Sequence, residues 1–309
     1  MILQSKIKSK PLLSFVLIVA IILVIFFGIG FLTKSKFFVT SLFEPPQQCL
    51  DQSDGYKKWS CFRPYFEKIT NEVSASAAMA EAIKLEVQRV VSDCHLFGHF
   101  AGETTLEKHN FDMGKAFSSC GEGCLNGCFH GVMERYLRDE TDLSNLPLQL
   151  KNICDDLGDS YGEKRRCVHG VGHGLSAHNY LSPINAANTC KIFGSDWEPY
   201  CIGGLLMEHV NQYLAWNLDE KGFQEIIPKI CTSFEHSENS ETNLIPNCIQ
   251  MLSLGLLYYS GYDLERSKEL CEELPQQKNI DQCRHDMEIM TLEEIPSNID
   301  FENFILTPQ

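Results

Sequence analysis

Residues 154–178 read CDDLGDSYGEKRRCVHGVGHGLSAH and contain the repeating unit from which the fold can be inferred. Its two cysteines, Cys154 and Cys167, enclose a polar, loop-like segment. An apolar segment with helical spacing, residues 146–155, ends at the first cysteine, and a second helix-like segment starts at the other. The stretch therefore predicts two helices joined by a loop, with a disulfide bond that ties the end of the first helix to the start of the second.

The same cysteine pattern recurs along the chain. The second cysteines of the pairs form a series with intervals of 33, 34, 39, 34, 47 and 35 residues: Cys61, Cys94, Cys128, Cys167, Cys201, Cys248 and Cys283. The first cysteines precede most of them by a short gap: Cys49, Cys120, Cys154, Cys190, Cys231 and Cys271. A helix–loop–helix unit of about 34 residues cannot bury its apolar faces alone, so such units stack. We predict an all-α fold, an α/α solenoid or closed toroid of about six to seven disulfide-stapled helical hairpins.

Each predicted hairpin has a helix A followed by a helix B. The clearest helix A spans residues 74–91, where strong helix formers follow a serine that can cap the helix. Shorter A segments are expected at residues 146–155, 183–192, 221–233 and 263–273. The B segments are expected to start at the second cysteine, with CFHGVMERYL, CVHGVGHGLSAH, CIGGLLMEHV and CIQMLSLGLLYY.

This register predicts the disulfide pairing. Six pairs join helix A to helix B of one hairpin: Cys49–Cys61, Cys120–Cys128, Cys154–Cys167, Cys190–Cys201, Cys231–Cys248 and Cys271–Cys283. Cys94 and Cys124 remain, and we expect them to pair across the boundary between two repeats. Closing loops of this size contributes roughly 3 kcal/mol per bond in the chain-entropy model.

The N-terminus predicts a membrane anchor. Residues 11–33 form an uncharged, mostly aliphatic run of 23 residues, which as a helix spans about 34 Å, enough to cross a bilayer. All 14 cysteines lie beyond it, between Cys49 and Cys283, as expected of a disulfide framework in an oxidising compartment. We expect a single-pass cell-membrane protein with a cytoplasmic N-terminus and an extracytoplasmic bulk. The predicted parts are a stub (1–10), a signal anchor (11–33), a linker (34–48), a helical-repeat domain (49–290) and a C-terminal cap or tail (291–309).

The charge of the chain excludes one class of partner. The sequence has 41 acidic and 26 basic side chains, a formal net charge of −15, and so lacks the basic surface that a nucleic-acid binder needs. Without the five lysines of the anchor and its flanks, the remaining 21 basic and 41 acidic side chains leave a charge of −20. This charge predicts a well-solvated surface, and attraction of cations is the alternative.

Histidines and glutamates stand near the starts of consecutive B segments. His95 and His99 are four residues apart, and so are His169 and His173. Residues four apart lie on one helix face, one turn apart, so each pair can point into one pocket. The predicted metal ligands are His95, His99, His130, His169 and His173, with Glu103, Glu134 or Glu208 as a further ligand or a general base.

The ligand types indicate the kind of metal. Imidazole and carboxylate together suit a divalent transition metal, namely Zn, Fe, Mn or Cu, and five or more ligands are enough for a dinuclear site. A bound metal would acidify water, which favours a metal-dependent hydrolase or a redox enzyme. The helix is not the His-Glu-x-x-His helix of zinc proteases, because glycine follows His169 and no glutamate lies between it and His173.

Two other functions fit the same residues. Glycines within these segments indicate either a closely packed neighbouring helix or a ligand, because each costs about 1 kcal/mol inside a helix. If close packing alone explains them, the histidines bond loop carbonyls, and the chain is a non-catalytic scaffold whose concave face binds an envelope protein or peptide. The other alternative is a protein that binds or buffers metal without turnover.

Two resemblances accompany this pattern. The stapled hairpins resemble helical repeat proteins of the Sel1-like and tetratricopeptide type, although the alanine, glycine and tyrosine positions that define those repeats are not matched. The combination of CHLFGH, GCFHG, CVHGVGHG and LLMEH over residues 90–215 resembles a family of membrane-anchored bacterial and archaeal proteins without an assigned function. The second resemblance implies that the histidines and glutamates act as a unit.

Overall fold

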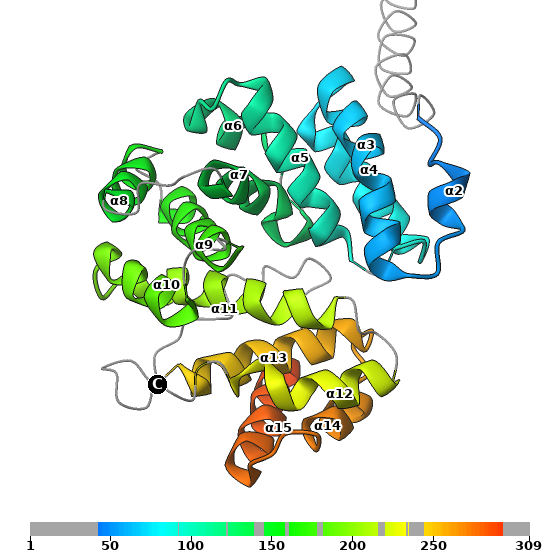
Figure 1. Ribbon diagram of the computed structural model, residues 1–309, viewed down its shortest axis with the longest axis vertical. Helices are drawn as coiled ribbons and strands as arrows, with labels where there is room; N and C mark the ends of the chain where they lie inside the picture. Colours follow the sequence, from blue (N-terminus) through cyan, green and yellow to red (C-terminus); the bar gives the residue numbers. More distant parts are fainter. Residues whose placement is uncertain are drawn as a thin grey trace, which may run out of the picture. The chain divides into compact units, whose positions relative to one another are not determined.

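The computed structural model describes residues 43–91, 93–121, 123–138, 145–157, 161–177, 182–215, 220–232, 234 and 244–292 (Figure 1). The chain divides into two compact units, Met1–Glu44 and Pro45–Gln309. The predicted anchor at residues 11–33 and residues 293–309 of the predicted tail lie outside the described residues. Within the described part, none of the helices combines the length and the apolar character needed to cross a bilayer.

The helices of the second unit form seven hairpins, as the repeat predicts, and its described residues contain no strand. The first helices of the hairpins are α2 (Gln47–Leu50), α4 (Ala75–Val87), α6 (Met113–Ser119), α8 (Leu146–Asp156), α10 (Pro183–Cys190), α12 (Glu220–Ile230) and α14 (Leu264–Cys271). The second helices are α3 (Gly55–Glu72), α5 (Cys94–Lys108), α7 (Gly127–Arg138), α9 (Tyr161–Ala177), α11 (Glu198–Leu214), α13 (Ile245–Tyr259) and α15 (Gln277–Leu292). The described residues also include two short 3-10 helices, η2 (Cys124–Asn126) and η3 (Lys191–Phe193).

Seven disulfide bonds staple the hairpins, and they use all 14 cysteines. The pairing is the one that the repeat register predicts. Six bonds connect the two helices of one hairpin. The seventh, Cys94–Cys124, connects the start of α5 to η2, immediately before α7. The disulfide prediction is therefore confirmed, including the bond across the repeat boundary.

The predicted helix boundaries need correction. Several B helices begin before their cysteine: α3 and α9 each start six residues upstream of it, and α11 starts three residues upstream. The start of α3 is capped by Asp54, whose carboxylate accepts a hydrogen bond from the backbone N–H of Lys57. A capping side chain can therefore begin a helix well before its cysteine. The predicted linker at residues 34–48 also ends earlier, because α2 begins at Gln47.

The B helices form the centre of the second unit. Each contacts the next B helix along the chain, from α3 to α15, while the A helices pack against them (Figure 1). The sixth hairpin also reaches back to the second. The Tyr258 hydroxyl donates to Glu86 (2.7 Å) and the Tyr259 hydroxyl donates to Asp93 (2.8 Å). Thus α13 contacts the segment that leads into α5, on which the first predicted ligands lie.

Glycines allow two pairs of B helices to touch backbone to backbone. A β-carbon on Gly131 of α7 would overlap the carbonyl oxygen of His99 on α5. A β-carbon on Gly204 of α11 would likewise overlap the carbonyl oxygen of His169 on α9. Close packing thus explains these glycines, and the residues that they approach are two of the predicted ligands.

Candidate metal centre

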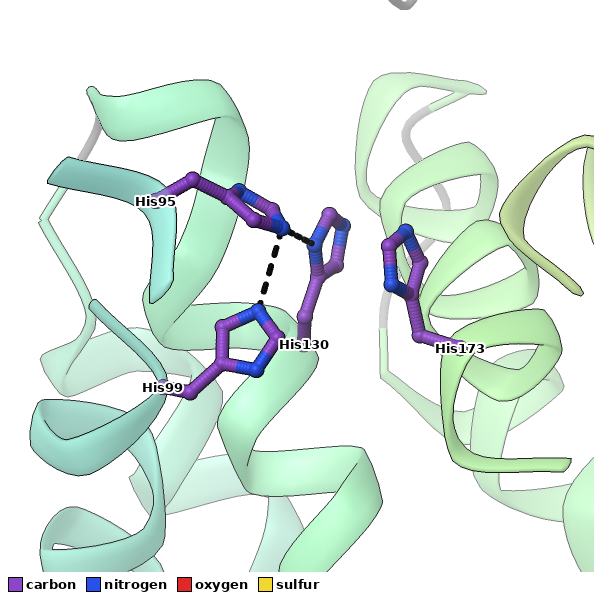
Figure 2. Close-up of side chains that lie close together, drawn as sticks. All are labelled: His95, His99, His130 and His173. Carbon is purple, nitrogen blue, oxygen red and sulfur yellow. Dashed lines mark hydrogen bonds between the residues drawn. The ribbon is translucent and has the colours of Figure 1, made fainter. Parts of the chain in front are cut away.

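The five predicted histidine ligands converge in the interior of the protein. His95 and His99 project from α5, His130 from α7, and His169 and His173 from α9. None of the five exposes more than 4% of its surface. Figure 2 shows four of these rings turned toward one another from three helices. The predicted stripe is therefore one buried cluster.

The ring nitrogens of the cluster are in contact. The Nε2 atoms of His95 and His99 lie 3.0 Å apart, and Nδ1 of His130 lies 3.4 Å from Nε2 of His95 (Figure 2). On the other side, the Nε2 atoms of His169 and His173 lie 3.2 Å apart. The rings of His130 and His173 stack, with centroids 3.8 Å apart.

Two glutamates orient two of the imidazoles. The Nδ1 atom of His99 lies 3.0 Å from a carboxylate oxygen of Glu134, and Nδ1 of His173 lies 3.1 Å from one of Glu208. Because a carboxylate only accepts hydrogen bonds, Nδ1 carries the proton in each ring. The Nε2 atom of each neutral ring is then a bare electron-pair donor, as in the carboxylate–histidine–metal arrangements of known metal sites.

A backbone carbonyl orients His95 in the same way. Its Nδ1 atom donates to the carbonyl oxygen of Cys124, at 2.9 Å. Neutral His95 therefore also presents an unprotonated Nε2, and this atom faces the Nε2 of His99. Two bare nitrogens at this distance repel each other unless a proton or a cation lies between them. The two nitrogens are thus placed to bind a proton or a metal cation between them.

The donor atoms form two groups that could hold a metal ion. One group consists of His95, His99, His130 and His173. The other consists of His99, His173, Glu134 and Glu208. In each group the donor atoms lie within 4.8 Å of one another, and most of the side chains are buried. His169 belongs to neither group, although its Nε2 atom contacts that of His173.

Two buried polar atoms of the cluster lack a hydrogen-bond partner among the described residues. They are Nε2 of His130 and Oε1 of Glu134. An unpaired buried polar group costs about 1–3 kcal/mol, and more if it is charged. Coordination of a metal ion through this Nε2 atom would remove the first of these costs.

Burial and the crowding of like groups keep most of the imidazoles neutral. Burial above all, together with neighbouring histidines, holds the pKa values of His130, His169 and His173 well below the usual value. Although burial opposes it, the carboxylate of Glu134 raises the pKa of His99 to about 9. Neutral imidazoles are the form that binds metals, so three of the donors are ready to do so at neutral pH.

Glu103, which we predicted as a ligand or a general base, lies outside both donor groups. Its buried carboxylate forms ion pairs with Arg63 of α3 (2.9 Å) and Arg138 of α7 (2.6 Å). Although burial acts in the opposite direction, these two arginines lower the pKa of Glu103. Glu103 thus joins three helices beside the cluster, while Glu134 and Glu208 take the places next to the imidazoles.

A small cavity of about 30 Å³ adjoins the cluster at His95. Its wall includes Leu254 of α13, Met207 of α11, and the side chains of Tyr258 and Tyr259. A cavity of this size has room for a water molecule. It therefore provides space for a water molecule beside the imidazole of His95.

Comparisons of the chain with protein-family models, curated proteins and solved structures find no match. The assignment of the site therefore rests on its own geometry.

The sequence contained a signal that spacing within one helix does not reveal. His99 precedes Glu134 by 35 residues, and His173 precedes Glu208 by the same number. These are the two hydrogen-bonded pairs of the cluster. Because 35 residues is about one repeat, a search for the same interval between unlike polar residues would have paired them.

Proposed function

We propose that this protein is a membrane-anchored, extracytoplasmic helical-repeat protein that binds a divalent transition metal in its buried histidine and glutamate cluster. The observation that carries the proposal is the group of four buried imidazoles whose donor atoms lie within 4.8 Å of one another. Hydrogen bonds to Glu134, Glu208 and Cys124 turn three of these rings so that Nε2 faces the centre. Satisfied structural histidines do not require such an arrangement, because one partner for each ring would suffice.

The donor set favours Zn, Cu or Fe over Mn. Imidazole nitrogen suits the first three, whereas Mn is better matched by carboxylate, carbonyl and water oxygens. The two glutamates already accept hydrogen bonds from Nδ1 of His99 and His173. We therefore assign the imidazoles as the direct ligands and the glutamates as their outer partners.

A bound ion in this environment would support either hydrolysis or redox chemistry. A metal-bound water has a pKa near neutral, so it supplies hydroxide where bulk water does not. Glu134 is the best placed general base, because its Oε1 atom has no hydrogen-bond partner among the described residues. Metal capture without turnover is the second candidate, and the complete burial of His173 favours it, because little of the centre is open to a large substrate.

The seven disulfide bonds and the uncharged run at residues 11–33 support the proposed compartment. Disulfide bonds persist in oxidising compartments. Labelling of intact cells with a membrane-impermeant reagent tests this part. The prediction is that lysines of the repeat domain react on intact cells; reaction only after lysis would contradict it.

Metal content tests the function itself. The full-length chain, purified in mild detergent without chelators, should contain stoichiometric transition metal by plasma mass spectrometry. His169→Ala with His173→Ala should reduce the content, whereas the exposed His285→Ala should not change it. Absence of metal from the wild type, even after incubation with Zn²⁺, would contradict the proposal and leave a non-catalytic interaction scaffold.

A further inference from the structure

The same arrangement of two histidines and one glutamate occurs twice in the cluster. Each half has two histidines one turn apart on one B helix and a glutamate on the next B helix: His95, His99 and Glu134 in the first half, and His169, His173 and Glu208 in the second. Corresponding residues are 74 positions apart. The Nε2–Nε2 distance is 3.0 Å in the first half and 3.2 Å in the second. The distance from Nδ1 to the carboxylate is 3.0 Å and 3.1 Å, respectively.

The two helices of each half also approach each other closely, although the glycines that allow this do not stand at corresponding positions. In the first half, Gly131 lets α7 approach the carbonyl of His99 on α5, and in the second half, Gly204 lets α11 approach the carbonyl of His169 on α9. Each half is thus a tightly crossed pair of B helices with the same donors at the crossing. The two halves meet where α7 packs against α9.

One ion does not use all the donors. His169 lies outside the group of four imidazoles whose donor atoms are all within 4.8 Å of one another, so it is not placed to share an ion with all four. It is nevertheless 97% buried, and its Nε2 atom faces Nε2 of His173. Its ring is also held by a hydrogen bond with the backbone of Tyr200. A second ion would account for this placement.

The nitrogen–nitrogen distances suit a chelated ion in each half. With metal–nitrogen bonds of about 2.05 Å, two imidazoles on one ion lie about 2.9 Å apart at a right angle and about 3.3 Å apart at the tetrahedral angle. The observed distances of 3.0 Å and 3.2 Å fall within this range. An ion can therefore enter either half with little movement of the rings.

His130 makes the two halves unequal. It stands at the position where the second half has Gly204, again 74 residues later. Its ring lies between the halves, stacked on His173, with Nδ1 3.4 Å from Nε2 of His95. The first half therefore has three imidazole donors and the second half has two.

We propose that the cluster binds two divalent transition-metal ions, one through His95, His99 and His130 and the other through His169 and His173. Glu134 and Glu208 then act as the outer partners of the two ions. This inference rests on the proposed metal-binding function and specifies its stoichiometry. The second ion has fewer protein ligands, so it keeps more positions for water or for a small molecule with oxygen or nitrogen donors. Two ions held close together can bind two donor atoms of one such molecule.

Titration with Co²⁺ tests the proposal on the full-length chain after removal of bound metal by a chelator. Visible absorption and calorimetry should give two Co²⁺ ions for each wild-type chain. The double variant His95→Ala, His99→Ala should bind one ion, and so should the double variant His169→Ala, His173→Ala. The exposed His285→Ala serves as the matched control and should bind two.

The outcomes separate this proposal from the one on which it rests. One ion for each wild-type chain would overturn the two-ion centre and leave metal binding intact, whereas no ion would overturn both. If each double variant lost both ions while its circular dichroism spectrum remained native, this would contradict the proposal that each half binds its own ion. The wild-type stoichiometry decides the question even if a double variant fails to fold.

Discussion

The imidazole rings of His130 and His173 stack face to face, with centroids 3.8 Å apart and planes 15° apart, although they belong to different helices. Two stacked imidazolium ions would repel each other strongly in the protein interior. The contact is therefore compatible only with rings of which at least one is neutral. Burial and this proximity hold the pKa of His130 well below its usual value, and burial does the same for His173.

Acid should destabilise the metal-free protein from about pH 6.5 downward. In the unfolded chain these histidines, together with His169, titrate near 6.5, but in the folded protein their pKa values are well below this. Below pH 6.5 the unfolded state binds more protons, so the free energy of unfolding falls. The slope is up to about 1.4 kcal/mol per pH unit for each histidine. Guanidinium unfolding between pH 7 and pH 5 measures it, and His173→Gln should reduce the slope; a midpoint that rises in acid would contradict the prediction.

Loss of the proton from His99 should destabilise the protein at high pH. The carboxylate of Glu134 overcomes the effect of burial and raises the pKa of His99 to about 9. This pair therefore contributes stability that is complete below pH 6.5 and is lost as the pH rises through 9. The same unfolding experiment, continued to pH 10, should show the decline in the wild type and a weaker decline in Glu134→Gln. Identical curves for the two proteins would argue against a protonated His99.

The outer carboxylates should affect affinity more than stoichiometry. Glu134→Gln and Glu208→Gln keep the shape of each side chain but weaken the hydrogen bond to Nδ1 of His99 or His173. Loss of such a partner weakens metal binding by about 10-fold to 100-fold. Competition with a coloured chelator measures the change.

Glu103→Gln is the matched control for this experiment. Glu103 is paired with Arg63 and Arg138 and lies outside both donor groups. Its substitution should lower stability, because it leaves two arginines without their carboxylate, but it should leave the metal affinity within a few-fold of the wild type. Equal losses of affinity in Glu103→Gln and Glu134→Gln would contradict the assignment of roles.

The helix crossing at Gly131 should not tolerate a side chain. Gly131→Ala would place its β-carbon on the carbonyl oxygen of His99 and force α5 and α7 apart. We expect the free energy of unfolding to fall by about 1–3 kcal/mol or more, and metal binding to become weaker. Gly162→Ala on α9, which has no neighbouring atom within 4 Å of the new β-carbon, should be neutral or slightly stabilising. Thermal unfolding of both variants measures the difference, and equal behaviour would contradict the close crossing.

The cavity beside His95 should control the rate at which metal leaves the centre. Leu254→Trp would fill this space of about 30 Å³ beside His95 without replacing a ligand. We expect slower extraction of bound Co²⁺ by a chelator, with unchanged stoichiometry. Leu148→Trp, at a residue that is 63% exposed on α8, is the control and should leave the extraction rate unchanged. If the two variants lose metal equally fast, the ion follows another route.

The sequence predicted the disulfides and the histidine cluster for different reasons. Cysteines at regular intervals mark the corners of the hairpins, and a covalent bond requires its two partners to meet there, so even Cys94 and Cys124 could be paired. Histidines four apart on a helix share one face whatever packs against it. The spacing thus placed His95 beside His99, and His169 beside His173.

Contacts between helices were harder to predict, because they depend on how one helix crosses the next. Glu103 is four residues from His99 and on the same face, yet Arg63, 40 residues earlier on α3, helps to draw it into an ion pair. The pairing of His99 with Glu134 likewise follows from the crossing at Gly131. His209, beside Glu208 in the sequence, instead bonds the carbonyl oxygen of Ile230, at 2.7 Å.

X-ray absorption at the metal edge can show directly whether histidines bind the ion, because it reports the ligands of the bound metal in the full-length protein. With Zn²⁺ or Co²⁺ bound, the spectrum should show nitrogen neighbours at about 2.0–2.1 Å together with the outer-shell scattering of imidazole rings. This scattering should decrease in His95→Ala, His99→Ala and remain unchanged in His285→Ala. A spectrum with oxygen neighbours alone, or one that all three proteins share, would contradict a metal centre built from the buried histidines.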